Sequence, residues 1–182
     1  MRVKNLINWV RNLVCRIRTF KLIVPSAIAS YRLTGQIIPL SVRILDNRMK
    51  FKCVRHKTAK VDMRGIIRIT PWLENYLPVV MVLEEHAEFR VEGDLIIGPN
   101  VRMSVGRNAS LSLGGRAQES GAGFTENVII LVAKSIEIGR DFLGSWGLFI
   151  TDADHHPYGD SNPPLPVKIG NHVWMCPNSS VM

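Results

Sequence analysis

The sequence predicts an all-β protein, a parallel β-helix that follows an N-terminal amphipathic helix. Three observations predict this fold. A six-residue pattern recurs through the second half of the chain, glycine or asparagine recurs within that pattern, and apolar residues before position 25 recur at helical spacing. The 182 residues are 46% hydrophobic and 21% charged, which is ordinary for a folded domain. No run approaches the roughly 20 apolar residues that a membrane-spanning helix needs.

Residues 3–24 are predicted to form the helix. Their apolar side chains follow the i, i+3, i+4, i+7 spacing of a single stripe, at Leu6, Ile7, Val10, Leu13, Val14, Ile17 and Val24. Pro25, Gly35 and Pro39 then predict a connector over residues 25–45. We therefore expect three regions: a basic helix and connector (1–45), a short β-rich segment (46–82) and the β-helix (83–182).

The positive charge of the chain is concentrated in its first quarter. Residues 1–45 hold eight Lys and Arg and no Asp or Glu, so residues 46–182 hold 15 of the 23 basic residues and all 15 acidic ones. Nucleic-acid-binding domains more often spread basic residues over a folded surface. A basic segment on a neutral body instead favours attachment of residues 1–24 to an anionic membrane surface. The alternative is a helix that packs on its own domain or on a neighbouring subunit.

The segment before the repeats shows the alternation of a strand, because Met49, Phe51 and Cys53 alternate with lysines. The chain has an odd number of cysteines and no CxxC spacing, the three being Cys15, Cys53 and Cys176. We therefore expect no disulfide framework, and we expect the protein to be cytoplasmic.

From Leu83 onward a hexad begins with an aliphatic residue, followed by a small or acidic one, two free positions, a small residue and a free position. The units are Leu83–Glu88, Ile97–Arg102, Val105–Ser110, Ile169–Trp174 and, with Phe142 as an exception, Ile138–Leu143. One hexad supplies a short strand and a corner, three close a triangular coil, and coils must stack to bury their aliphatic residues. An α-helix would instead carry glycine at nearly every turn, at about 1 kcal/mol each.

The inward positions follow a register. Steps of six relate Val132, Ile138, Gly144 and Ile150, and also Ile169, Met175 and Val181, whereas steps of eight relate Ile97, Val105 and Leu113. We therefore expect the turns between Ile97, Val105 and Leu113 to be irregular or to carry longer corners. We also expect Ile138, Ile150, Ile169 and Val181 to point inward.

The repeat is interrupted between Ile150 and Ile169. The interruption holds three aspartates, two histidines and four prolines within residues 151–168. A loop that leaves a regular solenoid is a common place for function.

The segments ITDADHHP and PVKIGNHVWMCPNSSVM, on either side of the proline-rich stretch, resemble the hexapeptide-repeat acyltransferases that O-acetylate bacterial surface polysaccharides. Many of these carry I-x-D-x-D-x-H-P followed by P-V-x-I-G-x-x-V-W-I-G. The resemblance covers residues 83–182. It implies a left-handed parallel β-helix, a homotrimer with active sites between subunits, acetyl-CoA as donor and a sugar hydroxyl as acceptor. No metal is implied.

By position, the resemblance assigns the catalytic motif to Asp152, Asp154 and His156, with His155 where an aromatic residue is common. Trp174 matches the tryptophan beside the CoA site, and Cys176 stands where glycine is common. A neutral histidine can take the proton of a sugar hydroxyl as it attacks a thioester, and a carboxylate can orient the imidazole. We therefore expect His156 to be the base, oriented by Asp152 or Asp154.

Other interpretations remain open at this stage. The two aspartates could cap a turn, Trp174 could pack in the core, and His156 could be a surface histidine. A zinc-dependent hydratase on the same fold could use His155, His156 and His172 as ligands. Because the chain stops at Met182 within a coil, a truncated β-helix without activity is a further alternative. We expect a cytoplasmic protein, peripheral at the inner face of the membrane if residues 1–24 bind lipid.

Overall fold

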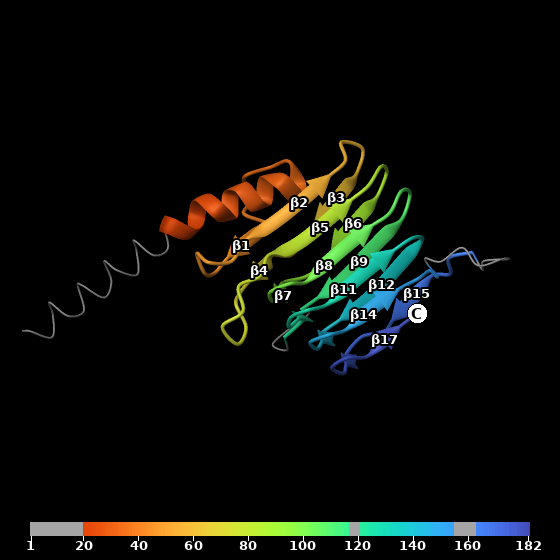
Figure 1. Ribbon diagram of the computed structural model, residues 1–182. Coiled ribbons are helices and arrows are strands. Elements are labelled where there is room, and N and C mark those ends of the chain that lie inside the picture. The colour runs from red at the N-terminus through yellow and green to blue at the C-terminus, as the bar shows by residue number, and fades with distance from the viewer. Residues whose placement is uncertain (1–19, 117–120, 155–162) are drawn as a thin grey trace, which may run out of the picture.

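The computed structural model describes residues 20–116, 121–154 and 163–182, which form one helix and a parallel β-helix of about five turns (Figure 1). All the paired strands are parallel and belong to three sheets. Sheet A contains β1 (Val42–Ile44), β4 (Ile67–Ile69), β7 (Leu95–Ile97), β10 (Gly123–Phe124), β13 (Leu143–Gly144) and β16 (Trp174–Met175). Sheet B contains β2 (Phe51–Arg55), β5 (Val79–Leu83), β8 (Arg102–Val105), β11 (Ile129–Val132), β14 (Phe149–Thr151) and β17 (Ser180–Val181). Sheet C contains β3 (Lys60–Met63), β6 (Glu88–Val91), β9 (Ser110–Gly115), β12 (Ser135–Arg140) and β15 (Val167–Ile169).

The chain visits the three sheets in the order A, B, C, so each set of three consecutive strands makes one coil. Ile97, Val105 and Leu113 occupy successive sheets and are almost completely buried, which confirms the eight-residue steps. The six-residue steps are confirmed as well, because Val132, Ile138, Gly144 and Ile150 are buried on the successive strands β11, β12, β13 and β14. Ile169 is buried and Val181 partly so. The predicted all-β fold with an N-terminal helix is correct.

Phe142, the exception in the hexad pattern, packs against Phe124 inside the prism. Its ring lies 5.0 Å from that of Phe124, tilted by 48°. Both rings are fully buried. Gly144 occupies an inward position, and a Cβ there would lie 2.4 Å from Cδ1 of Phe124. The missing side chain at Gly144 thus makes room for the Phe124 ring, against which Phe142 packs.

The corners carry a backbone requirement at the fourth position of the hexad, which the sequence pattern had left free. Seven residues at this position have φ between 54° and 59°, and they are His86, Asn100, Asn108, Asn127, Asp141, His172 and Asn178. Asparagine and aspartate tolerate this left-handed region better than most residues. The repeated asparagines therefore report a turn of fixed geometry.

The boundaries predicted for the N-terminal half are wrong in two respects. The helix covers residues 20–34 of the described chain, so it runs through Pro25 into the predicted connector. The first coil starts at β1, so residues 46–82 belong to the solenoid and are not a separate segment before it. The hexad pattern did not predict these early coils, because they lack the glycine-containing hexads of the later coils. Residues 3–19 of the predicted helix lie outside the described residues.

The helix continues past Pro25 because its inner stripe caps the first coil, and this packing outweighs local propensity. The stripe consists of Ser26, Ala29, Ser30 and Leu33, all buried. Ser30 Oγ accepts a hydrogen bond from the Val42 N–H at 3.0 Å and donates one to the Val42 carbonyl at 3.1 Å. Ser26 Oγ accepts from the Ile44 N–H at 3.0 Å. These hydroxyls satisfy the free edge of β1. The described part of the chain contains no helix long and apolar enough to cross a bilayer.

Candidate active site at an expanded corner

The corner between sheets B and C is short in one coil and long in the next. Between β11 and β12 it consists of residues 133–134, whereas between β14 and β15 it consists of residues 152–166. The structure describes residues 152–154 and 163–166 of the long corner. The predicted base His156 and its neighbour His155 lie outside the described residues.

Asp152, at the first position of the long corner, is bound to the backbone of the short corner below it. Its Oδ1 accepts a hydrogen bond from the Ala133 N–H at 2.6 Å. Its Oδ2 accepts from Lys134 at 2.7 Å and from Ser135 at 2.6 Å. The side chain is 5% exposed. Turn capping, one of the alternatives for Asp152, is therefore its structural role: the carboxylate fixes the start of the long corner on the regular solenoid.

The base of the long corner is closed by further hydrogen bonds. The Leu165 N–H donates to the Asp152 carbonyl at 3.0 Å, so the outgoing and returning segments are paired. Thr151 Oγ1 donates to the Ala153 carbonyl at 3.1 Å and accepts from the Ala153 N–H at 3.3 Å. The two described segments of the long corner, residues 152–154 and 163–166, are thus held together where they meet the solenoid.

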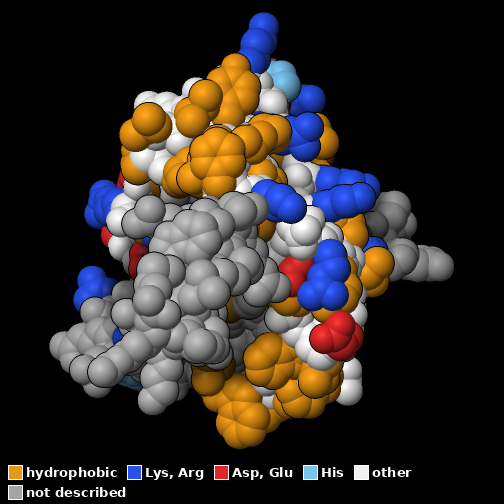
Figure 2. Space-filling view, turned by 90° about the vertical axis from the view of Figure 1, so that its left-hand side faces the viewer, with side chains coloured by type: hydrophobic (Ala, Val, Ile, Leu, Met, Phe, Trp, Pro, Cys, Tyr) orange, Lys and Arg blue, Asp and Glu red, His pale blue; other side chains and the backbone are white. Residues whose placement is uncertain are grey.

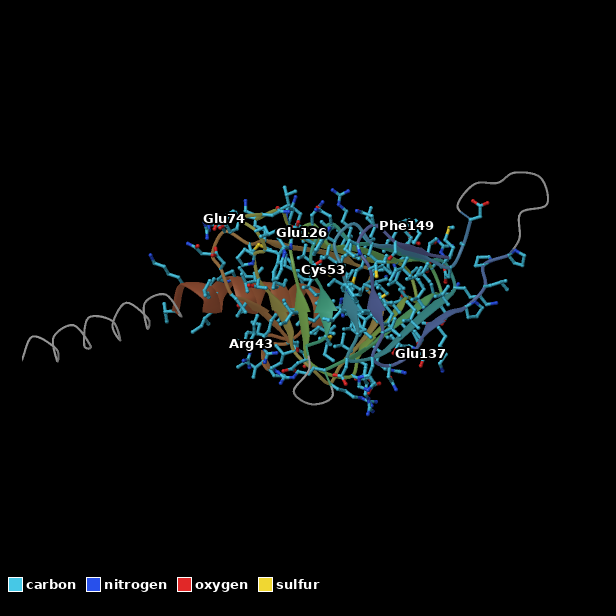
Figure 3. All side chains as sticks on the ribbon, turned by 90° about the horizontal axis from the view of Figure 1, so that it is seen from below. Arg43, Cys53, Glu74, Glu126, Glu137 and Phe149 are labelled. Atoms are coloured by element: carbon cyan, nitrogen blue, oxygen red, sulfur yellow. The ribbon has the colours of Figure 1, made fainter. Side chains whose placement is uncertain are left out.

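A cavity of about 650 Å³ lies beside this base. Its lining comes from the end of β14, both segments of the long corner, the start of β15 and Met182; the residues are Phe149, Thr151, Asp152, Ala153, Asp154, Pro163, Leu165, Pro166, Val167 and Met182. Phe149 lies toward the end of the solenoid opposite the N-terminal helix, on the other side from Glu137 (Figure 3). Asp154 is exposed where it lines the cavity. The cavity therefore joins a largely apolar wall to one accessible carboxylate.

Trp174 lies on a different face of the molecule. It is in β16 of sheet A, 66% exposed, and its Nε1–H donates to Ser145 Oγ at 2.8 Å. The alternative that Trp174 packs in the core is therefore wrong. Trp174 does not line the Asp154 cavity, so the chain does not bring the two predicted parts of the site together.

Cys176 follows β16 and is an exposed free thiol. Its place in the hexad is usually held by glycine, but the corner keeps the geometry of the others, because Asn178 has a φ of 54°. The Cys176 carbonyl accepts a hydrogen bond from Ser179 Oγ at 2.7 Å. The side chain is thus accommodated without altering the corner.

The ligands of the zinc alternative are divided between described and masked residues. His172, its only described member, is exposed on the corner between sheets C and A, with Nδ1 3.7 Å from Asp141 Oδ2. Among the residues that the structure describes, no three His, Cys, Asp or Glu side chains form a metal-binding group. No observation on the described chain favours a metal centre.

Sequence reasoning missed a second carboxylate that joins coils, Asp94. Its Oδ1 accepts from the Ile66 N–H at 2.9 Å, and Arg68 Nη1 donates to its Oδ2 at 2.8 Å. Partial burial favours a higher pKa for Asp94, but the hydrogen bonds from Ile66 and Arg68 outweigh it and lower the pKa. An aspartate directly after a glycine at the start of a strand was the only available signal.

Cys53 is a poor nucleophile, because burial raises the pKa of its thiol to about 11.

Fold and site together define a parallel β-helix protein in which the described ends of one long B–C corner line a largely apolar cavity that also contains Asp154. Comparison with models of known protein families, with curated proteins and with solved structures finds no match for this chain.

Proposed function

We propose that the protein is a hexapeptide-repeat acyltransferase with a left-handed β-helix. It would transfer an acetyl group from acetyl-CoA to a hydroxyl of a sugar in a bacterial surface polysaccharide or its precursor. The observation that carries the proposal is the anchored long corner. The D-x-D-x-H-P motif begins at the one B–C corner that is extended over residues 152–166, and Asp152 fixes that corner to the coil below.

The hydrogen bonds of Asp152 indicate that the two aspartates have different roles. The Asp152 carboxylate accepts hydrogen bonds from three backbone N–H groups, so Asp152 is a positioning residue. Asp154 is exposed at the cavity and is the carboxylate that we assign to orient the histidine. The sequence alone had left these roles interchangeable.

In the proposed reaction, His156 takes the proton of the sugar hydroxyl while the hydroxyl oxygen attacks the thioester carbonyl carbon. A carbon–oxygen bond forms and the carbon–sulfur bond then breaks. The CoA sulfur leaves with the electron pair and takes the proton from the imidazolium. Asp154 would hold one tautomer of His156 and stabilise its charged form. This general-base step typically contributes about 10²–10⁴-fold to the rate.

The separation of Trp174 from the cavity supports a site shared between copies of the chain. Trp174 lies on sheet A, whereas Asp154 follows a strand of sheet B. A homotrimer would allow sheet A of one copy to approach the long corner of the next. In that arrangement Trp174 contacts the CoA and Cys176 lies next to it.

Release of free CoA thiol tests the proposal. The full chain is incubated with acetyl-CoA and a panel of surface glycans, and thiol is measured with and without acceptor and with and without chelator. Acceptor-dependent release that a chelator leaves unchanged is expected. Stoichiometric zinc in the purified protein would support the zinc hydratase alternative, which acetyl transfer unaffected by chelator would exclude. No acceptor-dependent release with any glycan would overturn the transferase assignment.

A further inference from the structure

The N-terminal helix presents most of its large apolar side chains away from the protein. Its inner stripe against β1 is mostly small, with two serines and an alanine among its four residues. Its outer side chains are 43–71% exposed, and they are Phe20, Ile23, Val24, Ile28 and Tyr31. We call these five residues the outer stripe. A helix that only caps a solenoid would carry polar residues on this side.

The outer stripe follows helical spacing and continues into the next segment. Phe20, Val24 and Ile28 are four residues apart, and Tyr31 follows three residues later, so these side chains share one face. The connection after the helix adds Ile37 and Ile38, which are 54% and 83% exposed. Such a concentration of exposed apolar surface marks an interaction site.

Basic residues border the outer stripe. Lys21 and Arg32 are exposed and, at about 100° per residue, lie together on one flank of the stripe. Residues 1–45 of the sequence contain no Asp or Glu, and Asp46 is the acidic residue that lines a small pocket together with Lys21. Figure 2 shows hydrophobic side chains with Lys and Arg beside them on the upper part of the helix-bearing face.

We propose that the outer stripe docks on an anionic lipid bilayer. The apolar side chains would enter the interface while Lys21 and Arg32 remain at the level of the acidic headgroups. Charge decides between a bilayer and a second copy of the chain. Two outer stripes packed antiparallel would bring their basic flanks together, whereas an anionic surface complements this charge. This surface differs from the 1–24 segment expected from the sequence, because it extends through residue 38.

The inference does not depend on the proposed acyltransferase activity, and its test measures binding alone. Full-length protein is sedimented with vesicles of neutral phosphatidylcholine, and with the same lipid containing phosphatidylglycerol. Binding to the anionic vesicles is expected, and raising the salt to about 0.5 M should weaken it, because the Debye length falls well below 8 Å.

A matched pair of double variants assigns the surface. Val24→Gln with Ile28→Gln removes two outer side chains that are 57% and 49% exposed. Val54→Gln with Ile96→Gln removes the same residue types at 67% and 47% exposure from strands β2 and β7. The first pair should lower vesicle affinity by about ten-fold or more, and the second should leave it within about two-fold.

Three outcomes would overturn the inference: equal binding to neutral and anionic vesicles, equal losses in the two double variants, and no binding by the unaltered chain. If light scattering instead shows concentration-dependent self-association that Val24→Gln with Ile28→Gln abolishes, the outer stripe joins copies of the chain. Circular dichroism of both variants checks that the fold is retained.

Discussion

The two B–C corners at β11–β12 and β14–β15 differ in length but are joined by one side chain. The first is a tight turn of residues 133–134, and the second extends over residues 152–166. Asp152 begins the long corner and binds three N–H groups at the short one. A solenoid can thus extend one corner without losing register when the extension is fixed to the coil below.

The largest effect should come from changing how closely the regular coils stack. Gly98 and Gly170 hold the same hexad position, but a Cβ at Gly98 would lie 1.4 Å from the Thr125 carbonyl oxygen, whereas one at Gly170 meets nothing within 4 Å. Gly98→Ala should therefore lower the free energy of unfolding by about 3 kcal/mol or more. Gly170→Ala should change it by less than about 1 kcal/mol. Denaturant unfolding measures both, and equal effects would contradict the coil spacing.

Removing the link between the two corners should have the next largest effect. Asp152→Ala leaves three backbone N–H groups without their carboxylate, which should cost about 3 kcal/mol of unfolding free energy. Asp154→Ala, two residues further along, is the control and should cost less than about 0.5 kcal/mol because Asp154 is exposed. Amide hydrogen exchange at Ala133, Lys134 and Ser135 should accelerate in Asp152→Ala alone. Unchanged protection there would show that Asp152 does not hold the long corner.

Side-chain hydrogen bonds to the backbone also hold the end of the solenoid that the N-terminal helix caps. Fewer such bonds are made there, so removing them should lower the free energy of unfolding by less. Ser30→Ala removes both hydrogen bonds to Val42 in β1. Since these groups are buried, we expect a loss of about 2 kcal/mol, measured by thermal unfolding. Ser110→Ala removes one half-buried hydrogen bond to Ser135 and should cost about 0.5 kcal/mol. If the two variants unfold alike, the helix does not stabilise the edge of β1.

The smallest effect concerns Asp94, which joins coils as Asp152 does but is more exposed. Its pKa is lower in the folded chain, so its contribution to stability is present above the unfolded pKa of about 3.9 and disappears as the pH falls through the folded value. Asp94→Asn should cost less than about 1 kcal/mol at pH 7, because the ion pair with Arg68 is partly solvated. The difference from the unaltered chain should close below about pH 4. A difference that grows on acidification would contradict the assigned pKa direction.

The sequence predicted the later coils well because each hexad there shows its burial and its corner in one short pattern. Ile97, Val105 and Leu113 could be assigned to the core from spacing alone. The early coils could not be found in this way, since residues 42–82 bury alternating side chains between corners of unequal length. The extension of the helix past Pro25 depends on contacts of Ser26 and Ser30 with a strand distant in sequence, and no local pattern reports such contacts.

The candidate site was predictable to a lesser degree. The interruption of the repeat located the long corner and placed Asp152 and Asp154 within it. It could not separate their roles, because the three N–H donors to Asp152 come from another coil. Nor could it show that Trp174 lies on a different sheet from the strand before Asp154. The sheet to which a residue belongs depends on how many strands separate it from the residue with which it is compared.

The central claim is that the anchored corner carries the base of an acyltransferase, and the turnover of His156→Ala tests it most directly. Acceptor-dependent thiol release from acetyl-CoA is measured for the unaltered chain, His156→Ala and His155→Ala, with acetyl-CoA affinity measured separately. The account predicts that His156→Ala lowers turnover by about 10²–10⁴-fold with little change in affinity, while His155→Ala is milder. An active His156→Ala beside an inactive His155→Ala would assign the base to the neighbouring histidine. Full turnover in both variants would contradict the proposed mechanism.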